Sequence, residues 1–290
     1  MKFLREYTDE DLPLIKSYSS YIETLSYFYK PSYVHLWKDR NDIYIYEGTF
    51  GLYIYLKAYN AFLLPWSANM YEALGELQEI AKAEGLDELN IKSIPDKYLH
   101  YFHDDRYDIF RDRDLDEYIY LQEKLIGLSG RQLQSKRNHI SQFVKAYPNH
   151  QLVAMEKGDA DKILEMTEIW VNNMPEEFQN DLRDEFVSIK RAFQFWDDFE
   201  LSGTILKVED KIIAYTIGEA QNNEVIVHYE KADTNYHGAY TMINREYQLN
   251  YAPHSLFVNR MEDAGIEGLR KAKESYKPIR MVQKWDAKLK

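Results

Sequence analysis

The chain has 290 residues, a formal net charge of −12 at pH 7, 45% hydrophobic residues and no cysteine. This length suits one large domain or two of about 150 residues, and the lack of cysteine excludes thiol catalysis, disulfide bonds and thiolate metal sites. No stretch approaches the ~20 consecutive apolar residues of a membrane helix, and the N-terminus is too charged for a signal peptide. The sequence therefore predicts a cytoplasmic protein without a transmembrane segment.

Positive charge is concentrated in two segments, although the chain as a whole is acidic. Residues 124–155 contain five Lys or Arg and no Asp or Glu, and residues 267–290 contain eight Lys or Arg against three acids. Each segment carries a net +5, which leaves −22 for the rest of the chain. We interpret the two segments as an anion-binding region in an acidic body. Two solvated helix faces are the alternative interpretation.

The first part of the chain predicts a small α/β unit. Hydrophobic periodicity indicates a helix, a hairpin, a short strand, a helix and a strand, at 9–19, 42–46 with 52–57, 61–65, 69–84 and 88–94. The polar segment 100–116 is predicted to be a connection, and 117–126 a strand that bridges the two halves. We place the domain boundary there, which gives domains at 1–125 and 126–290.

A second α/β unit is predicted from the rest of the chain. Ser129 can cap a helix that Pro148 closes. A strand, two helices and two strands follow, at 151–156, 159–173, 181–199, 203–208 and 211–219. The stretch 225–285 then predicts strand, helix, strand, helix and strand, with polar clusters where strands end and helices begin. Such places can bind anions, because free N–H groups and the helix dipole favour negative charge.

The densest polar cluster after a predicted strand runs from Asn259 to Gly265 and contains Arg260, Glu262 and Asp263. Acids there could hold an ammonium group or orient the arginine. A salt-bridged turn that positions the next helix is the alternative.

Basic residues form two further candidate groups. Arg270 and Lys273 lie on one face of a predicted helix and could receive a phosphate, although a solvated amphipathic face would look the same. Lys136 and Arg137 fall at the edges of an apolar stripe and can point into a cleft.

A metal site is not expected. His100 and His103 are three residues apart and are followed by Asp104 and Asp105, but charged surface residues are the more common explanation of such a short polar run.

Four motifs carry a resemblance to a known family: LSGRQLQSKRNHISQF at 128–143, EKAD at 230–233, HGAYTMIN at 237–244 and FVNRMEDAGIEGLRKAKESYKP at 257–278. They resemble the phosphatidylglycerol lysyltransferase C-terminal domain family, formerly a domain of unknown function. The resemblance implies an α/β (α+β) fold of two tandem acyl-CoA N-acyltransferase (GNAT)-like domains, with mixed central sheets flanked by helices. It also implies similarity to the aminoacyl-tRNA-dependent transferases that extend cell-wall peptides. The predicted element order agrees with that fold.

The resemblance implies a transferase that moves an aminoacyl group from aminoacyl-tRNA to an amine or hydroxyl acceptor, either a lipid or a peptide. Because the ester donor is already activated, the protein needs to supply only positioning and oxyanion stabilisation. On this hypothesis the basic candidates contact an oxyanion or phosphate, the acids hold an amine or accept a proton, and the asparagines orient substrate. The three sets are Lys231, Arg260, Arg270 and Lys273; Asp233, Glu262 and Asp263; and Asn244 and Asn259.

Two alternatives remain open: a non-catalytic protein that binds a phosphate-bearing ligand or an RNA end, and an acetyl-CoA-dependent N-acetyltransferase. In acetyl-CoA-dependent relatives the turn before the helix has a second small residue, which lets the backbone approach pyrophosphate. Here Tyr240 follows Gly238 and Ala239 at that position, so acetyl-CoA is the less favoured donor and no cofactor is predicted with certainty.

Overall fold

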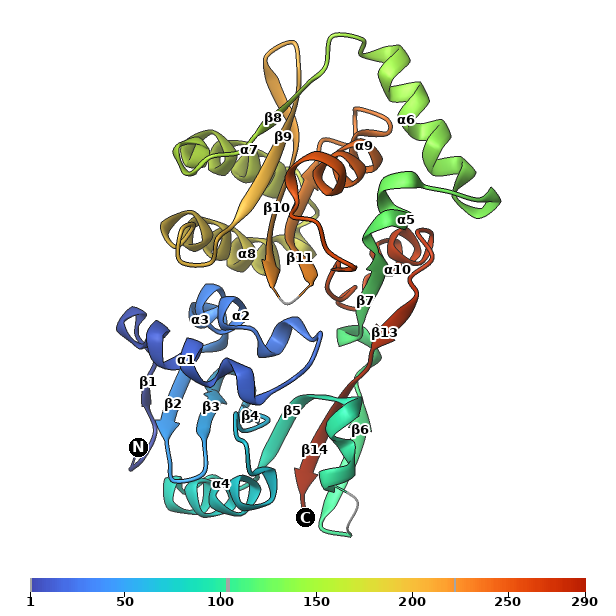
Figure 1. Cartoon of the computed structure of the whole chain (residues 1–290). Coiled ribbons are helices and arrows are strands. Elements are labelled where there is room, and N and C mark those ends of the chain that lie inside the picture. The colour runs from blue at the N-terminus through green and yellow to red at the C-terminus, as the bar shows by residue number, and fades with distance from the viewer. Residues whose placement is uncertain (1, 103–104, 222) are drawn as a thin grey trace. The chain divides into compact units, whose positions relative to one another are not determined.

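The computed structural model describes residues 2–102, 105–221 and 223–290, which form two compact units (Figure 1). The first unit comprises Met1–Glu117 and Val282–Lys290, and the second comprises Tyr118–Met281. The sequence places the change of domain near residue 125. In the structure the change lies at residue 117, and the C-terminal segment returns to the first unit, which a single boundary in the sequence cannot describe.

The first unit contains a seven-stranded mixed sheet in the order β1-β2-β3-β4-β5-β14-β6. Its strands are β1 (Arg5–Glu6), β2 (Ile43–Glu47), β3 (Leu52–Leu56), β4 (Ala61–Leu63), β5 (Asn90–Pro95), β14 (Lys284–Leu289) and β6 (Tyr107–Arg111). Its helices are α1 (Leu12–Tyr18), α2 (Pro31–Leu36), α3 (Lys38–Asn41) and α4 (Met70–Glu84). Helix α4 ends at Gly85, whose φ of 71° is left-handed, as the sequence predicts.

The second unit contains another seven-stranded sheet, in the order β13-β7-β12-β11-β10-β9-β8. Its strands are β7 (Glu117–Leu121), β8 (Gln151–Ala154), β9 (Ser202–Val208), β10 (Lys211–Gln221), β11 (Glu224–Ala232), β12 (Phe257–Asn259) and β13 (Arg280–Val282). Its helices are α5 (Gln122–Gly127), α6 (Gln134–Ala146), α7 (Ala160–Asn172), α8 (Glu176–Gln194), α9 (Ala239–Glu246) and α10 (Glu267–Glu274). Helices α7 and α8 lie on one side of this sheet and α9 on the other (Figure 1). The predicted fold class, mixed sheets flanked by helices, is confirmed.

The two sheets have the same plan and exchange one strand. In the first sheet, the last strand of the chain, β14, lies between β5 and β6. In the second sheet, β7 lies between β12 and β13, although it precedes all of that unit's other strands in the sequence. Each sheet is therefore completed by a strand from a distant part of the chain.

Two segments differ from the sequence prediction. The predicted connection 100–116 contains β6, an edge strand that pairs with β14 and is exposed except at Tyr107, so it lacks the apolar alternation of a covered strand. The predicted strand 117–126 ends at Leu121 and continues as α5. The residues of α5 before its final glycine include several good helix formers, which explains the change.

The site is positioned by a separation of two parallel strands. Strands β11 and β12 pair only from Glu224 to Ile226, and β11 then continues alone on that side to Ala232. A bulge at Gly218 in the neighbouring strand β10 accompanies this divergence. A Cβ at Gly218 would lie 2.5 Å from both the Ile226 carbonyl oxygen and the Tyr247 hydroxyl, so the position requires glycine.

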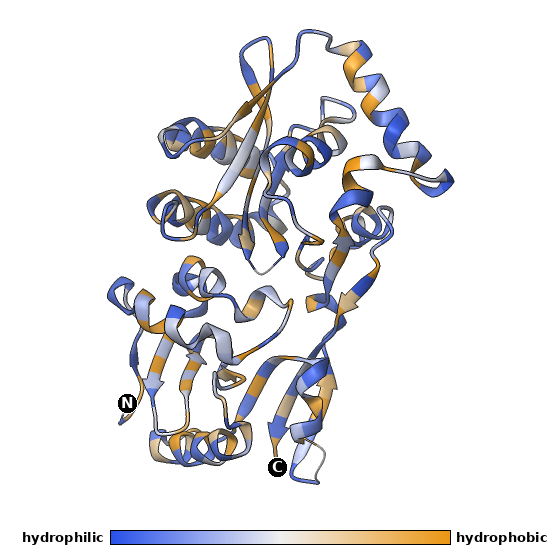
Figure 2. Cartoon of the chain, in the orientation of Figure 1, coloured by the Kyte–Doolittle hydropathy of each residue, from blue (hydrophilic) through white to orange (hydrophobic). Residues whose placement is uncertain are grey.

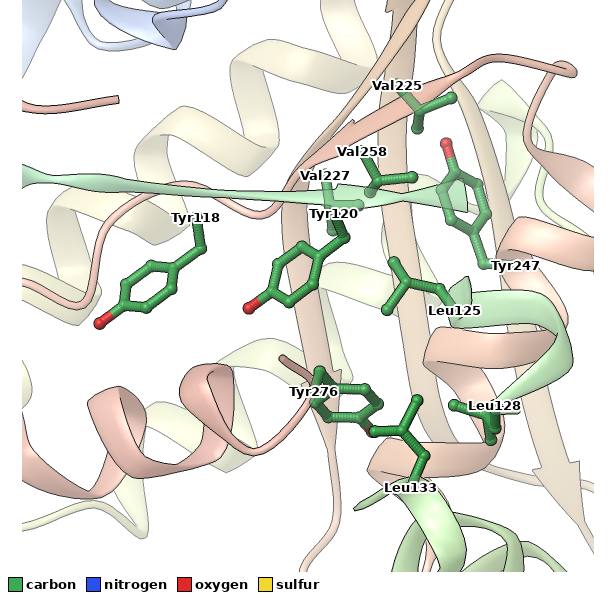
Figure 3. Packing of buried hydrophobic residues seen from close by; sticks show 10 residues of the cluster. All are labelled: Tyr118, Tyr120, Leu125, Leu128, Leu133, Val225, Val227, Tyr247, Val258 and Tyr276. Carbon is green, nitrogen blue, oxygen red and sulfur yellow. The ribbon is translucent and has the colours of Figure 1, made fainter. Parts of the chain in front are cut away.

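The core beside the diverging strands is rich in tyrosine. Ten buried residues from β7, α5, β11, β12 and the segments around them form the cluster shown in Figure 3, in which Tyr118 and Tyr120 project from β7 on the same side and Tyr276 lies near Tyr120. Figure 2 shows that the helices alternate between apolar and polar stretches, as amphipathic helices against a sheet should. The aromatic rings of this core pack against the polar residues of the site described below.

Candidate functional site

A buried ion pair lies where β11 and β12 diverge. Arg260, directly after β12, donates from Nη2 to Glu230 Oε1 at 2.8 Å, and Asn244 of α9 donates from Nδ2 to Glu230 Oε2 at 2.9 Å. The side chains of Arg260 and Glu230 are only 11% and 10% exposed. Burial opposes the charge on Arg260, but the Glu230 carboxylate outweighs it and raises the pKa of the guanidinium. The guanidinium therefore keeps its charge in the folded chain.

Two aromatic rings support the guanidinium. Its carbon lies 4.8 Å from the ring centroid of Tyr276 and 5.7 Å from that of Tyr120, within the range of cation–π attraction. Lys136 of α6 also reaches Tyr276, with Nζ 4.1 Å from the ring centroid. Burial and the nearby Arg260 charge lower the pKa of Lys136 to about 8. Two cations thus converge on one buried phenol ring.

Lys273 of α10 fixes the turn that carries Arg260. Its ammonium donates to the Arg260 carbonyl oxygen at 2.7 Å and to the Glu262 carbonyl oxygen, while the Tyr120 hydroxyl donates to the Lys273 carbonyl oxygen at 2.8 Å. Burial lowers the pKa of Lys273 to about 8. Because its ammonium is buried and donates to two backbone oxygens, Lys273 positions the turn that carries the arginine.

Asp263 of the same turn and Arg270 of α10 form a separate ion pair. Arg270 donates to Asp263 from Nε at 2.9 Å and from Nη2 at 2.7 Å, and the Tyr118 hydroxyl donates to Asp263 Oδ2 at 2.6 Å. Although burial opposes ionisation, these hydrogen bonds lower the pKa of Asp263 to about 2. This arrangement matches the salt-bridged turn that the sequence allows as an alternative.

Lys231 and Asp233 do not join the Arg260 cluster. Side chains alternate along β11, so Lys231 points to the opposite face from Glu230, where it lies 2.5 Å from Glu185 and stacks on Trp170. Asp233 accepts from Lys211 at 3.0 Å. Lys231 therefore contacts helix residues on the other face of the sheet, and Asp233 forms an ion pair just after the end of β11.

Arg137 and Asn259 have local roles. Arg137 donates to the Leu128 and Gly130 carbonyl oxygens and so holds the turn before α6. Asn259 Oδ1 accepts from the Met261 amide at 2.8 Å. Of the predicted set, the structure brings Arg260, Asn244, Lys136 and Lys273 together.

Sequence reasoning missed Glu230, Tyr120 and Tyr276. Glu230 begins the motif EKAD, and strand alternation places it on the face opposite Lys231. That alternation was the available signal for choosing Glu230 over its neighbour. The two tyrosines carry no comparable signal, because ring contacts depend on tertiary packing.

The N-terminus of α9 is covered by the chain itself. Gly238 has φ of 88°, and a Cβ there would lie 2.6 Å from the His139 carbonyl oxygen of α6. The phenol oxygen of Tyr240 accepts a hydrogen bond from the Ala232 amide at the end of β11. The α6 backbone thus packs closely against the turn before α9, and the Tyr240 phenol lies at the end of β11.

The part of the chain that the structure describes contains no candidate membrane helix and no candidate metal site. No helix there has the length and apolar character needed to cross a membrane, and no group of three or more His, Asp or Glu residues is placed to hold a metal. His103 and Asp104 of the histidine-containing motif lie outside the described residues.

Comparison with known proteins identifies the family. The sequence model described as phosphatidylglycerol lysyltransferase, C-terminal, matches residues 22–288. The chain belongs to this family. The resemblance drawn from the four motifs is confirmed, and the family together with the fold supports an acyltransferase.

Individual relatives share the sequence or the fold to different degrees. A conserved protein of unknown function from Bacteroides thetaiotaomicron is 29% identical, with a TM-score of 0.89 and full coverage of both chains. The L-PGS of Bacillus licheniformis has a TM-score of 0.67 at 14% identity, over 98% of this chain and 92% of that one, which shows a shared fold. An uncharacterised protein of Mycoplasmoides gallisepticum is 27% identical over 59% of this chain and 56% of its own length, so the match spans little more than half of that relative.

Proposed function

We propose that this protein transfers an aminoacyl group from an aminoacyl-tRNA to an amine or hydroxyl acceptor, with Arg260 at the reacting centre. The observation that carries the proposal is the buried Arg260–Glu230 pair with Asn244, at the divergence of β11 and β12. A guanidinium held in a low-dielectric site by a carboxylate and two rings is preorganised to stabilise developing negative charge.

The reaction that this site suits is attack of the acceptor on the aminoacyl ester. A bond forms between the acceptor nitrogen or oxygen and the acyl carbon, the ester bond breaks, and the acceptor's proton passes to the leaving ribose oxygen. Arg260 would stabilise the oxyanion of the tetrahedral intermediate. Lys136, with a pKa of about 8, is suited to carry the proton near neutral pH. Lys273 and Glu230 would hold the arginine in place.

The basic segment that begins at residue 124 supports a polyanionic donor better than the C-terminal one does. Arg131 and Lys145, at either end of α6, are exposed, and that segment contains no acid. In the C-terminal segment most of the cations form ion pairs within the described chain: Arg270 with Asp263, Lys271 with Glu267, Lys284 with Glu117, Lys288 with Glu88 and Lys290 with Asp108. We therefore assign tRNA contact to α6.

Acetyl-CoA is the less favoured donor for two reasons. The α6 backbone packs against Gly238, and the Tyr240 phenol takes the Ala232 amide. Pyrophosphate binding at this helix N-terminus needs free amides and open space. The close packing at Gly238 reduces the space at the helix N-terminus, and the Tyr240 side chain lies where a small residue would leave room.

The direct test supplies the purified chain with radiolabelled aminoacyl-tRNAs and three acceptors: vesicles containing phosphatidylglycerol, vesicles without it, and a peptide with a free amine. We expect transfer to one acceptor, and loss of transfer in Arg260→Gln. Lys97→Met serves as the matched control, because Lys97 is an exposed partner of Glu23 in the first unit. Turnover of acetyl-CoA with no aminoacyl transfer would overturn the proposal, and tRNA binding without transfer would favour a binding protein.

A further inference from the structure

One edge of the first sheet is an exposed strand. Strand β6 lies at the end of that sheet, beyond β14 (Figure 1), and its five residues exceed the two, four and three of the other edge strands, β1, β8 and β13. Ile109 is 36% exposed and Phe110 is 56% exposed. Proteins usually blunt such an edge with a proline or a bulge, because its backbone can pair with another chain. Strand β6, all of which is described, contains no proline and no bulge against β14.

The hydrogen bonds to the C-terminal segment decide which backbone groups of β6 face outward. The Arg106 carbonyl oxygen accepts from an amide of residues 284–290 at 2.8 Å, and the Asp112 amide donates to a carbonyl oxygen of the same segment at 3.0 Å. In an antiparallel pair such bonds recur at every second residue. The N–H and C=O groups of Ile109 and Arg111 therefore point away from β14, toward the open edge.

A second copy of β6 is complementary to this edge. A two-fold axis makes the two strands antiparallel, and opposite residues must both direct their N–H and C=O groups into the pair. Ile109 placed opposite Ile109 of the second copy meets this condition. Arg106 of each copy then faces Asp112 of the other, and Arg111 faces Tyr107. Opposite charges and cation–aromatic pairs across antiparallel strands are both stabilising.

The neighbouring registers are unfavourable. Because the outward groups recur at every second residue, the next possible registers shift one strand by two residues. One shift places Asp108 of each copy opposite Asp112 of the other, and the other shift places Asp108 opposite its own counterpart. Like charges directly opposite each other are destabilising. The charges around β6 therefore select the register that is centred on Ile109.

The environment of Asp112 supports this pairing. Burial and the nearby Asp286 carboxylate raise the pKa of Asp112. A guanidinium brought by a second copy would favour the charged form of Asp112 and so oppose this shift. Arg106, which would supply it, is exposed. The two residues that would form the intermolecular ion pair thus lie at opposite ends of one exposed strand.

We propose that this protein forms a two-fold dimer in which β6 of one copy pairs antiparallel with β6 of a second copy, with Ile109 at the axis and Arg106 of each copy against Asp112 of the other. The first-unit sheets of the two copies then continue into one another, as in other cases of strand addition. A contact of one short strand per copy is small, so the dimer forms at micromolar concentrations. This surface is independent of the proposed reaction.

The first test measures self-association of the full chain by sedimentation velocity, from about 1 to about 200 μM, a range that suits a small interface. We expect the sedimentation coefficient to rise from that of a monomer to that of a dimer. Arg106→Asp and Asp112→Arg should each weaken the dimer about tenfold or more, because like charges then face each other. The combined variant should restore it. Lys97→Asp is the matched control, because it changes the net charge as Arg106→Asp does at an exposed residue outside β6.

Three outcomes of the sedimentation experiment overturn the proposal. The first is a monomer at every concentration. The second is a dimer that neither single charge reversal weakens more than Lys97→Asp does. The third is a combined variant that associates no better than the two single ones.

The second test locates the interface by amide hydrogen exchange of the full chain. The amides of Ile109 and Arg111 should exchange more slowly as the concentration rises, whereas those of Asp108 and Phe110, which face β14, should not change. Ile109→Pro removes an outward donor without removing a bond to β14, so it should abolish the dimer in a chain that circular dichroism shows to be folded. Unchanged exchange at Ile109 and Arg111 in a dimeric sample, or a dimer that survives Ile109→Pro, would place the interface elsewhere and overturn the assignment.

Discussion

The two units share a sheet plan and differ at the place where the parallel strands separate. In the first unit, β4 and β5 pair at Phe62 and Leu63, and the buried Tyr29 hydroxyl then bridges the strands, accepting from the Leu64 amide at 3.2 Å and donating to the Lys92 carbonyl oxygen at 3.4 Å. In the second unit, the corresponding space beside β11 contains Arg260, Glu230 and Asn244. In the first unit a tyrosine hydroxyl thus bridges the parallel strands where they separate. In the second unit charged and polar side chains line the corresponding space.

Buried charge alone does not mark the site, as the first unit also shows. Lys284 and Glu117 are both fully buried and 2.5 Å apart. Glu117 also accepts from the Ser26 hydroxyl and from the Tyr27 amide, each at 2.8 Å. Every carboxylate oxygen there has a partner within the chain. The pair in the second unit differs because Arg260 Nη1 and Asn244 Oδ1, both among the described atoms, have none.

The largest expected effect is on stability and lies in the first unit. Lys284→Met leaves the Glu117 carboxylate buried without its counter-charge, so we expect the free energy of unfolding to fall by about 3–5 kcal/mol. Urea denaturation measures this. Lys290→Met is the matched control, since its pair with Asp108 is about half exposed and should change stability by less than about 1 kcal/mol. A similar loss of unfolding free energy in the two variants would show that the buried Lys284–Glu117 pair is no more important for stability than the exposed pair.

The next effect is on activity and lies in the second unit. Arg260→Gln removes the charge that stabilises the oxyanion, so kcat for aminoacyl transfer should fall by about 10²–10³-fold. Arg270→Gln is the comparison, because Arg270 is engaged by Asp263. It should lower stability while the folded fraction keeps its activity. A larger loss of kcat in Arg270→Gln than in Arg260→Gln would mean that Arg270, and not Arg260, lies at the reacting centre.

The sequence predicts the order of elements and the family, and it predicts the site only partly. Helices and strands follow from local periodicity, so α4, β9 and β10 lie close to their predicted positions. The exchange of β7 and β14 depends on pairing between segments more than a hundred residues apart, which no local pattern encodes. Likewise, Asp263 and Arg270 look as functional as Arg260 in the sequence. Only the contacts separate a satisfied pair from one with open atoms.

A smaller effect concerns acid stability. Arg270 and Tyr118 hold the folded-state pKa of Asp263 at about 2, below its ordinary 3.8. This stabilisation is therefore present above pH 4 and is lost as the pH falls from about 4 to about 2. Asp263→Asn should lower the free energy of unfolding by about 2 kcal/mol at pH 6 and have little effect near pH 2.

Asp11 of the first unit is the comparison for this prediction. Arg5 lowers the pKa of Asp11 to about 2, but the Arg5 side chain is 55% exposed. Solvent should therefore screen the pair, and Asp11→Asn should show a smaller acid dependence than Asp263→Asn. Urea denaturation between pH 2 and pH 6 measures both. An equal or larger effect at Asp11 would mean that burial does not strengthen the Asp263 pair.

The smallest expected effects are on tRNA binding and concern the two basic segments. Arg131→Ala and Lys145→Ala should each lower the slope of log affinity against log salt by about one unit, because each removes one phosphate contact. Arg270→Ala should leave that slope unchanged, since its guanidinium already pairs with Asp263. Filter binding of aminoacyl-tRNA over a range of salt concentrations measures the slope, with folding checked by circular dichroism. A slope that falls for Arg270→Ala and stays constant for both Arg131→Ala and Lys145→Ala would move the tRNA contact from residues 131–145 to α10.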